Sequence, residues 1–241
     1  MVYGSHPCAT VERALELKGV PYRTVELPPF LHVPVQRLVF GRRTVPGIKI
    51  GTEKISGSRA IVRRLDELVP EPPLYPADPG ARARVEEAER WGEEVLQPLG
   101  RRLLWPALKR HPERAASYSD GAKLALPGAV TRASTPVIAR AEIWLNKASD
   151  EAVRSDLGAL PGHLERVDGW IADGTLDGEE LNAADLQIAS TLRLLMTLED
   201  LRPMIDSRPA GKLALRVFPS LAGSLPAGAL PREWLPVAAA A

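Results

Sequence analysis

The segment VPGIKIGTEKISGSRA, residues 45–60, decides the fold of the N-terminal part of this chain. Two short runs of alternating apolar and polar residues, Ile48–Ile50 and Glu53–Ile55, lie on either side of a turn at Gly51. This pattern predicts a β-hairpin. The apolar residues that follow have helical spacing, and they predict a helix that begins at about Ser58.

Helical and strand patterns alternate on the N-terminal side of the hairpin. Apolar residues recur at helical spacing over Val11–Lys18, and Gly19 ends this repeat. Alternation over Tyr22–Leu27 then predicts a strand, and Val2-Tyr3 predicts a shorter one. Residues 28–41 are ambiguous, with a short helix as the favoured interpretation.

Prolines separate this region from the rest of the chain. Five of the 23 prolines fall between Val69 and Gly80, where they are incompatible with a helix interior or a central strand. We therefore predict one domain over 1–75, a linker over 76–80 and an all-helical domain over 81–241. Amphipathic helices are expected at about 81–111, 128–148, 151–173, 183–200 and 208–217.

The clearest local signal in the helical region is Leu181-Asn182-Ala183-Ala184-Asp185-Leu186. Asn182 is suited to cap a helix N-terminus with its side chain. Asp185 would occupy the third helical position and bond back to the amide of the cap, which completes a capping box.

Composition and charge exclude several classes of protein. A chain of 241 residues with 45% hydrophobic content can bury one large core or two modest ones. Its 31 Lys and Arg are interleaved with 30 Asp and Glu, which argues against a nucleic-acid-binding surface.

Cysteine and histidine usage points to a reducing compartment without a metal site. Cys8 is the only cysteine, so the chain cannot form an intrachain disulfide or a thiolate zinc site. The four histidines have no metal-ligand spacing. Charged residues near the N-terminus argue against a signal peptide, and no apolar run approaches the ~20 residues that span a bilayer. We expect a cytoplasmic protein.

The order of these elements resembles that of the soluble glutathione transferases of the serine type. The resemblance implies an α/β thioredoxin-like, thiol-binding domain over 1–75, followed by an all-α bundle over 81–241 that carries a second-substrate pocket. It rests on Ser5-x-Pro7-Cys8 ahead of the first helix, on Val45-Pro46 with Gly57-Ser58 twelve residues later, and on the capping box at Asn182–Asp185.

Ser5 is the first candidate catalytic residue. The N-terminus of a helix presents free amides and about half a positive charge, which lower the pKa of a thiol placed there. The resemblance gives Ser5 the role of holding the glutathione thiolate by a hydrogen bond. The alternative is that Ser5 only caps the first helix.

Cys8 is the second candidate catalytic residue. In a C-x-x-C frame it takes the second position, and Ser5 holds the first, so a dithiol cycle within the chain is excluded. We favour Cys8 as a small buried apolar side chain. The alternative is a thiol-dependent reductase that uses Cys8. His6 lies between the two candidates and could reach a bound thiol, but we favour a solvated histidine in the turn.

The resemblance assigns binding of the thiol peptide to two further pairs of residues. Val45-Pro46 matches a cis-proline whose preceding residue pairs with the cysteinyl unit like an added strand, so we predict that Pro46 is cis. Gly57-Ser58 opens a helix whose amides and Ser58 hydroxyl would bind the γ-glutamyl carboxylate. The family usually has an acidic or amide side chain where Gly57 stands, which removes one contact here. Arg43 and Arg59 are further candidates for the anionic peptide.

The implied function is a transferase of alkyl or aryl groups in detoxification. Glutathione would be the co-substrate, no metal is implied, and a small electrophile would bind in an apolar pocket between the domains. Trp91, Leu104, Trp105 and Leu108 offer apolar material for this pocket, and the alternative is that the tryptophans belong to the core. The alternatives are a non-catalytic binding or assembly protein of the same fold, or the Cys8 reductase.

Two further expectations follow from the resemblance. We expect a homodimer, in which the helix near Arg82 offers Val85, Ala88 and Val95 on one face. Only Met1–Tyr3 precede the first turn, whereas the first strand of the family is several residues longer. Either this strand is very short or the translation start lies upstream.

Overall fold

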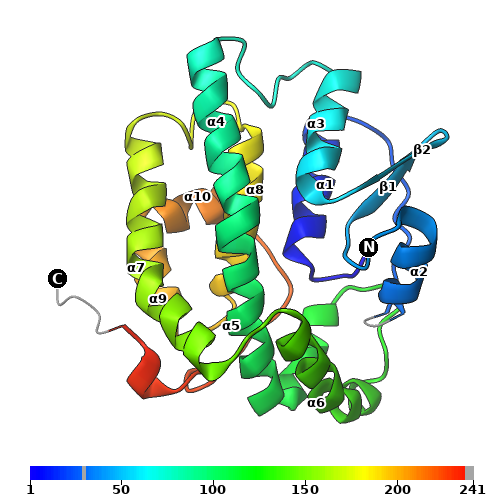
Figure 1. Ribbon diagram of the computed structural model, residues 1–241, viewed down its shortest axis with the longest axis vertical. Coiled ribbons are helices and arrows are strands. Elements are labelled where there is room, and N and C mark those ends of the chain that lie inside the picture. Colours follow the sequence, from blue (N-terminus) through cyan, green and yellow to red (C-terminus); the bar gives the residue numbers. More distant parts are fainter. Residues whose placement is uncertain (29–30, 237–241) are drawn as a thin grey trace.

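The computed structural model describes residues 1–28 and 31–236 (Figure 1). The N-terminal part contains α1 (His6–Leu17), α2 (His32–Phe40), β1 (Gly47–Ile50), β2 (Glu53–Ser56) and α3 (Ser58–Leu68). The helical part contains α4 (Pro79–Trp91), the π-helical turn η1 (Gly92–Leu96), α5 (Gln97–Arg110), the 3₁₀ segment η2 (Pro112–Ser119), α6 (Gly128–Leu145), α7 (Asp150–Ala172), α8 (Ala183–Leu195), α9 (Arg202–Asp206), α10 (Pro209–Val217) and the 3₁₀ turn η3 (Arg232–Trp234). A thioredoxin-like domain followed by an all-helical domain confirms the predicted fold class.

The predicted hairpin and the helix after it are confirmed. β1 pairs with β2 in antiparallel register, with Ile48 opposite Ile55 and Ile50 opposite Glu53. Gly51 in the turn has a φ of 59°, in the left-handed region that glycine adopts without a steric penalty.

The two strands predicted nearer the N-terminus are wrong. In the described part of the chain, neither Val2-Tyr3 nor Tyr22–Leu27 forms a strand. Two hydrogen bonds join these segments, and both involve Met1. The Leu27 amide donates to the Met1 carbonyl at 2.8 Å, and the Met1 amino group donates to the Val25 carbonyl at 2.6 Å. One paired residue is too little to define a ladder, so alternation alone leaves 22–27 as extended backbone.

Helix α8 joins the two parts of the molecule. Its side chains are buried on nearly all sides, and it packs between α1 and α3 on one side and α4 and α10 on the other (Figure 1). The Thr10 hydroxyl of α1 donates to Ser190 Oγ of α8 at 2.8 Å. The predicted capping box is confirmed, because Asn182 accepts from the Asp185 amide and Asp185 accepts from the Asn182 amide.

A single long rod from Pro79 to Arg110 confirms the helix predicted at 81–111, but η1 interrupts its α-helical register. A Cβ atom at Gly92 would lie 3.0 Å from Ile188 Cγ1, so the missing side chain lets the rod approach α8 closely. Helices α6, α7, α8 and α10 match the other predicted ranges to within a few residues, whereas α9 was not predicted. Among the described helices, none combines the length and apolar character needed to cross a membrane.

Lys18 ties the proline-rich segment to the N-terminal domain. Its buried ammonium group follows the end of α1 and donates to Asp66 at 2.5 Å, to the Pro70 carbonyl at 3.2 Å and to the Pro72 carbonyl at 2.6 Å. The segment between α3 and α4 is therefore held in one conformation by a charged anchor.

Candidate active site

A cavity of about 290 Å³ lies between the two domains. We call it the inter-domain cavity. The N-terminal domain forms one wall with residues 2–7, 32–33 and 43–45, and α5, η2 and α6 supply most of the other. Of the residues expected in an apolar pocket, Leu104, Trp105 and Leu108 line it. Trp91 instead packs in the helical domain, with its ring 5.3 Å from that of Trp170.

Ser5 lies at the N-cap position of α1 and lines the inter-domain cavity. Its backbone is extended, with φ −77° and ψ 116°, but within the described structure its side chain makes no capping hydrogen bond. The turn before it depends on Gly4, which has a φ of 73° and no room for a Cβ atom against the Tyr118 carbonyl. The hydroxyl therefore stands at the helix end without serving as its cap.

Cys8 is 1% exposed and faces a different cavity. This second cavity, of about 750 Å³, is lined by α1, α2, β1, α3 and the extended segment 20–27. Burial raises the pKa of the Cys8 thiol, and contacts with the Ser5 side chain and the Val2 backbone offset only part of this rise. The thiol is thus stabilised in its protonated form.

His6, between Ser5 and Cys8, lines the inter-domain cavity and is almost fully buried. Burial, and to a smaller extent the positive charge of Arg101, lowers the pKa of His6 well below its usual value. At neutral pH His6 is an uncharged imidazole, and it adds no positive charge to the cavity.

The Val45–Pro46 peptide bond is cis, as predicted. Val45 lines the inter-domain cavity, whereas Pro46 is buried and lines the second cavity. The structure thus places Ser5 and Val45 on the same wall.

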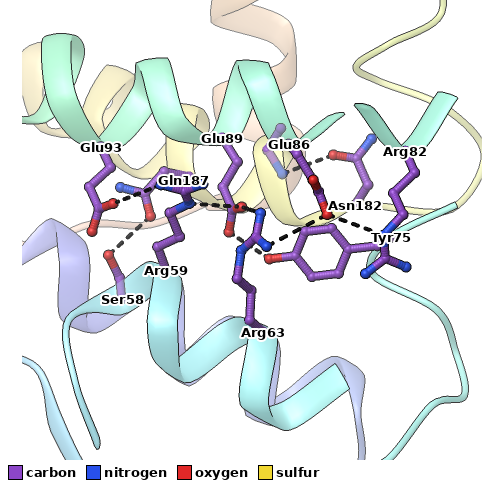
Figure 2. Close-up of polar contacts among 11 residues, drawn as sticks. Ser58, Arg59, Arg63, Tyr75, Arg82, Glu86, Glu89, Glu93, Asn182 and Gln187 are labelled. Carbon is purple, nitrogen blue, oxygen red and sulfur yellow. Dashed lines mark hydrogen bonds and ion pairs between the residues drawn. The ribbon is translucent and has the colours of Figure 1, made fainter. Parts of the chain in front are cut away.

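Gly57 and Ser58 are not among the described residues that line the inter-domain cavity. Ser58 is 2% exposed and lies outside the described lining of both cavities. Its hydroxyl donates to Gln187 Oε1 of α8 at 3.0 Å (Figure 2). Domain packing has therefore given the predicted carboxylate-binding hydroxyl a partner within the chain.

A cluster of charges fastens α3 to α4 beside Ser58 (Figure 2). Glu89 is 1% exposed and accepts hydrogen bonds from Tyr75 at 2.7 Å, from Arg59 at 3.4 Å and from Arg63 at 3.3 Å. Burial raises the pKa of Glu89, and these partners oppose the rise. We call Ser58, Arg59, Arg63, Tyr75, Glu89 and Gln187 the closed interface. Arg59 belongs to it, so of the two candidate arginines only Arg43 lines the inter-domain cavity.

Among the polar residues of the inter-domain cavity that the sequence interpretation missed are Arg101 of α5 and Glu142 and Asn146 at the end of α6. Arg101 Nε donates to Asn146 Oδ1 at 3.2 Å, and Asn146 Nδ2 donates to Glu142 at 3.0 Å. A signal for Arg101 was present, because it shares helical spacing with Leu104, Trp105 and Leu108 and so lies on the apolar stripe of its helix.

Comparison with known proteins identifies the N-terminal domain. Residues 1–73 match the family described as "Glutathione S-transferase, N-terminal domain". These residues are therefore similar to the N-terminal domain of glutathione S-transferases. No protein of curated function matches the sequence significantly.

Solved structures extend the likeness to the whole chain. Glutathione transferase F2 from Populus trichocarpa is 16% identical, with a TM-score of 0.60 and 89% of each chain covered. A Tau class glutathione S-transferase from mango, Mangifera indica, is 15% identical, with a TM-score of 0.59 over 98% of this chain and 90% of that one. FzlA from C. crescentus is 16% identical, with a TM-score of 0.57 over 92% and 94%. The chain has the glutathione transferase fold.

Proposed function

We propose that this protein is a glutathione transferase-like enzyme that holds the glutathione thiolate at Ser5. The observation that carries the proposal is the position of Ser5. It lies at the N-terminus of α1, makes no capping bond within the described structure, and lines the inter-domain cavity on the same wall as Val45.

The chemistry follows from this position. The partial positive charge at the start of α1 lowers the pKa of the bound thiol, whose proton passes to water. The Ser5 hydroxyl donates a hydrogen bond to the thiolate. The sulfur then forms a bond to the electrophilic carbon of an alkyl or aryl compound, and the leaving group departs with its electron pair. The apolar lining strengthens these electrostatic effects by excluding water.

Binding of the peptide would use the remaining predicted residues. The Val45 backbone, set by Pro46, pairs with the cysteinyl unit like an added strand. Gly57 and Ser58 at the start of α3 bind the γ-glutamyl carboxylate. Because Ser58 donates to Gln187, this binding requires the hydroxyl to exchange one acceptor for another.

We further propose a cytoplasmic homodimer that acts in detoxification, with its domains divided at 1–75, 76–80 and 81–241. The face of α4 that we expected to form dimer contacts does not support the dimer, because Val85 and Ala88 are buried in the core of the same chain. The dimer therefore rests on the likeness of fold, and light scattering at micromolar concentration tests it.

The test compares two serines that both occupy N-cap positions. Ser149 caps α7 with its side chain, which accepts from the Ala152 amide, whereas Ser5 makes no such bond to α1. Glutathione binding is measured by calorimetry, and conjugation is measured with 1-chloro-2,4-dinitrobenzene. We expect wild type and Ser149→Ala to bind and conjugate, and Ser5→Ala to bind glutathione but lose turnover. Full turnover by Ser5→Ala contradicts the proposal.

One observation favours a second candidate, a non-catalytic binding or assembly protein. The hydroxyl of Ser58 is already satisfied by Gln187 in the closed interface. Neither glutathione binding nor conjugation by the wild type is the outcome that this candidate predicts. The reductase alternative has less support, because Cys8 is buried and its pKa is raised.

A further inference from the structure

Arg101 is oriented toward the inter-domain cavity by neutral partners. Its Nε donates to Asn146 Oδ1 at 3.2 Å, and its Nη1 donates to Gln97 Oε1 at 2.8 Å. Both acceptors are amide oxygens, so they fix the guanidinium plane without neutralising its charge. Within the described structure Nη2 makes no hydrogen bond.

The positive charge around the cavity exceeds the negative charge. Arg43 and Arg101 both line it, and among residues 1–28 and 31–236 no carboxylate lies within 4.0 Å of either guanidinium. Glu142 lines the same cavity, and one oxygen of its carboxylate accepts a hydrogen bond from Asn146 Nδ2. Burial lowers the pKa of Arg101 to about 10; the negative charge of Glu142 opposes this shift, and the cations Arg102 and Arg43 add to it. The group stays charged at neutral pH, and the two cations Arg43 and Arg101 outnumber the one carboxylate, Glu142, in the described lining.

A partly buried cation without a direct ion pair is costly, because a carboxylate that acts on it only from a distance, as Glu142 does through Asn146, offsets just part of the desolvation. An anion in the cavity would remove this cost. A carboxylate suits the planar guanidinium, which presents two N–H groups to its two oxygens.

Resting on the function proposed above, we propose that the electrophilic substrate is a small apolar compound with a carboxylate group, and that Arg101 binds this carboxylate. The carbon skeleton would pack on Leu104, Trp105 and Leu108, which share one face of α5 with Arg101. This face belongs to the helical domain, whereas Ser5 and Val45 belong to the opposite wall. The arrangement therefore assigns Arg101 to the second substrate and not to the peptide.

The experiment measures binding of 4-chlorobenzoate and of the neutral 4-chlorobenzamide by calorimetry, without glutathione. We expect wild type to bind the acid about tenfold more tightly than the amide, as hydrogen bonds to a charged group allow. Arg101→Gln should lose this preference, and Arg101→Lys should keep most of it. Arg140→Gln is the matched control, because Arg140 is exposed on α6 outside the cavity lining and its loss changes the net charge equally.

A substitution at Glu142 should change the affinity for the acid in the opposite direction. Its negative charge faces the same cavity, so Glu142→Gln should tighten acid binding and leave amide binding unchanged. Melting curves identify variants that fail to fold. If Arg101→Gln is one of them, the wild-type preference and its retention by Arg101→Lys decide the question.

Two results overturn the proposal. One is equal affinity of the wild type for acid and amide, and the other is an acid preference that survives in Arg101→Gln. Glutathione also carries carboxylates, so titrations with glutathione test whether Arg101 binds the peptide and not the second substrate. If Arg101→Gln weakens glutathione binding tenfold while the benzoate preference stays, Arg101 binds the peptide and the substrate assignment is wrong. Because the benzoate measurement needs no thiol, its failure leaves the test of Ser5 intact.

Discussion

The closed interface and the inter-domain cavity are two parts of one domain boundary, and they treat positive charge in opposite ways. In the closed interface, Glu89 pairs with Arg59 and Arg63 and also accepts from Tyr75, while Glu93 and Glu86 each pair with one of the two arginines (Figure 2). In the cavity, Arg101 is held by amide oxygens alone. Charges paired within the chain fasten the domains, whereas Arg101, which has no direct ion pair among the described residues, is the group we propose for ligand binding.

The largest effect is expected in the closed interface. Glu89→Ala leaves two arginines and a tyrosine hydroxyl without their shared acceptor, and it should lower the free energy of unfolding by about 3 kcal/mol. Arg101→Gln should cost less than 1 kcal/mol, because no described ion pair is broken. Urea unfolding of both variants checks the contrast. Similar losses in the two variants would remove the distinction between the two regions.

The second prediction concerns pH and the N-terminus of α8, which supplies Gln187 to the closed interface. Burial raises the pKa of Asp185 from 3.8 to about 6. The folded state therefore binds a proton more tightly than the unfolded state, so this stabilising contribution is complete below pH 3.8 and is lost as pH rises to about 6. Relative to Asp185→Asn, wild type should lose on the order of 2 to 3 kcal/mol across this window. Urea titrations at several pH values measure it, and a constant difference would contradict it.

The third prediction concerns the cavity wall. Ser5→Ala should lower turnover tenfold or more, which corresponds to about 1.4 kcal/mol, through a raised pKa of the bound thiol. Unfolding stability should hardly change, since no capping bond is lost from α1. Ser149→Ala should do the reverse, with a stability loss of about 1 kcal/mol and full turnover. A thiolate titration and melting curves give both readouts.

The smallest effect is expected at Cys8. Cys8→Ala removes one buried sulfur and should lower stability by about 1 kcal/mol, with turnover nearly intact. Conjugation assays and thermal melts check this. Loss of turnover in this variant, together with full activity of Ser5→Ala, would favour the reductase over the transferase.

Local chemistry made part of this structure predictable from sequence. Turn residues at Gly51 specify the hairpin, and Asn182 with Asp185 specifies the start of α8, because each signal acts within a few residues. The strand at Tyr22–Leu27 failed because a strand also needs a neighbouring edge, which alternation does not supply. In the site, Ser5 and Val45 both line the inter-domain cavity, and the roles that their motifs suggest stay predictions. The positions of Ser58 and Arg101 depend on how α8 and α6 pack against them, and no short motif encodes that packing.

The π-helical turn η1 lies between α4, which carries Glu89 of the closed interface, and α5, which carries Arg101 of the inter-domain cavity. Its hydrogen bonds reach one residue further than those of an α-helix, so it holds one more residue per turn. Each residue advances an α-helix by about 100°. One extra residue in a regular α-helix would rotate α5 against α4 by about that angle, but the wider turn of η1 absorbs it. Glu89 can therefore face α3 while Arg101, Leu104 and Trp105 face the cavity. If residues 92–96 became α-helical at the same chain length, these three side chains would turn away from the cavity together.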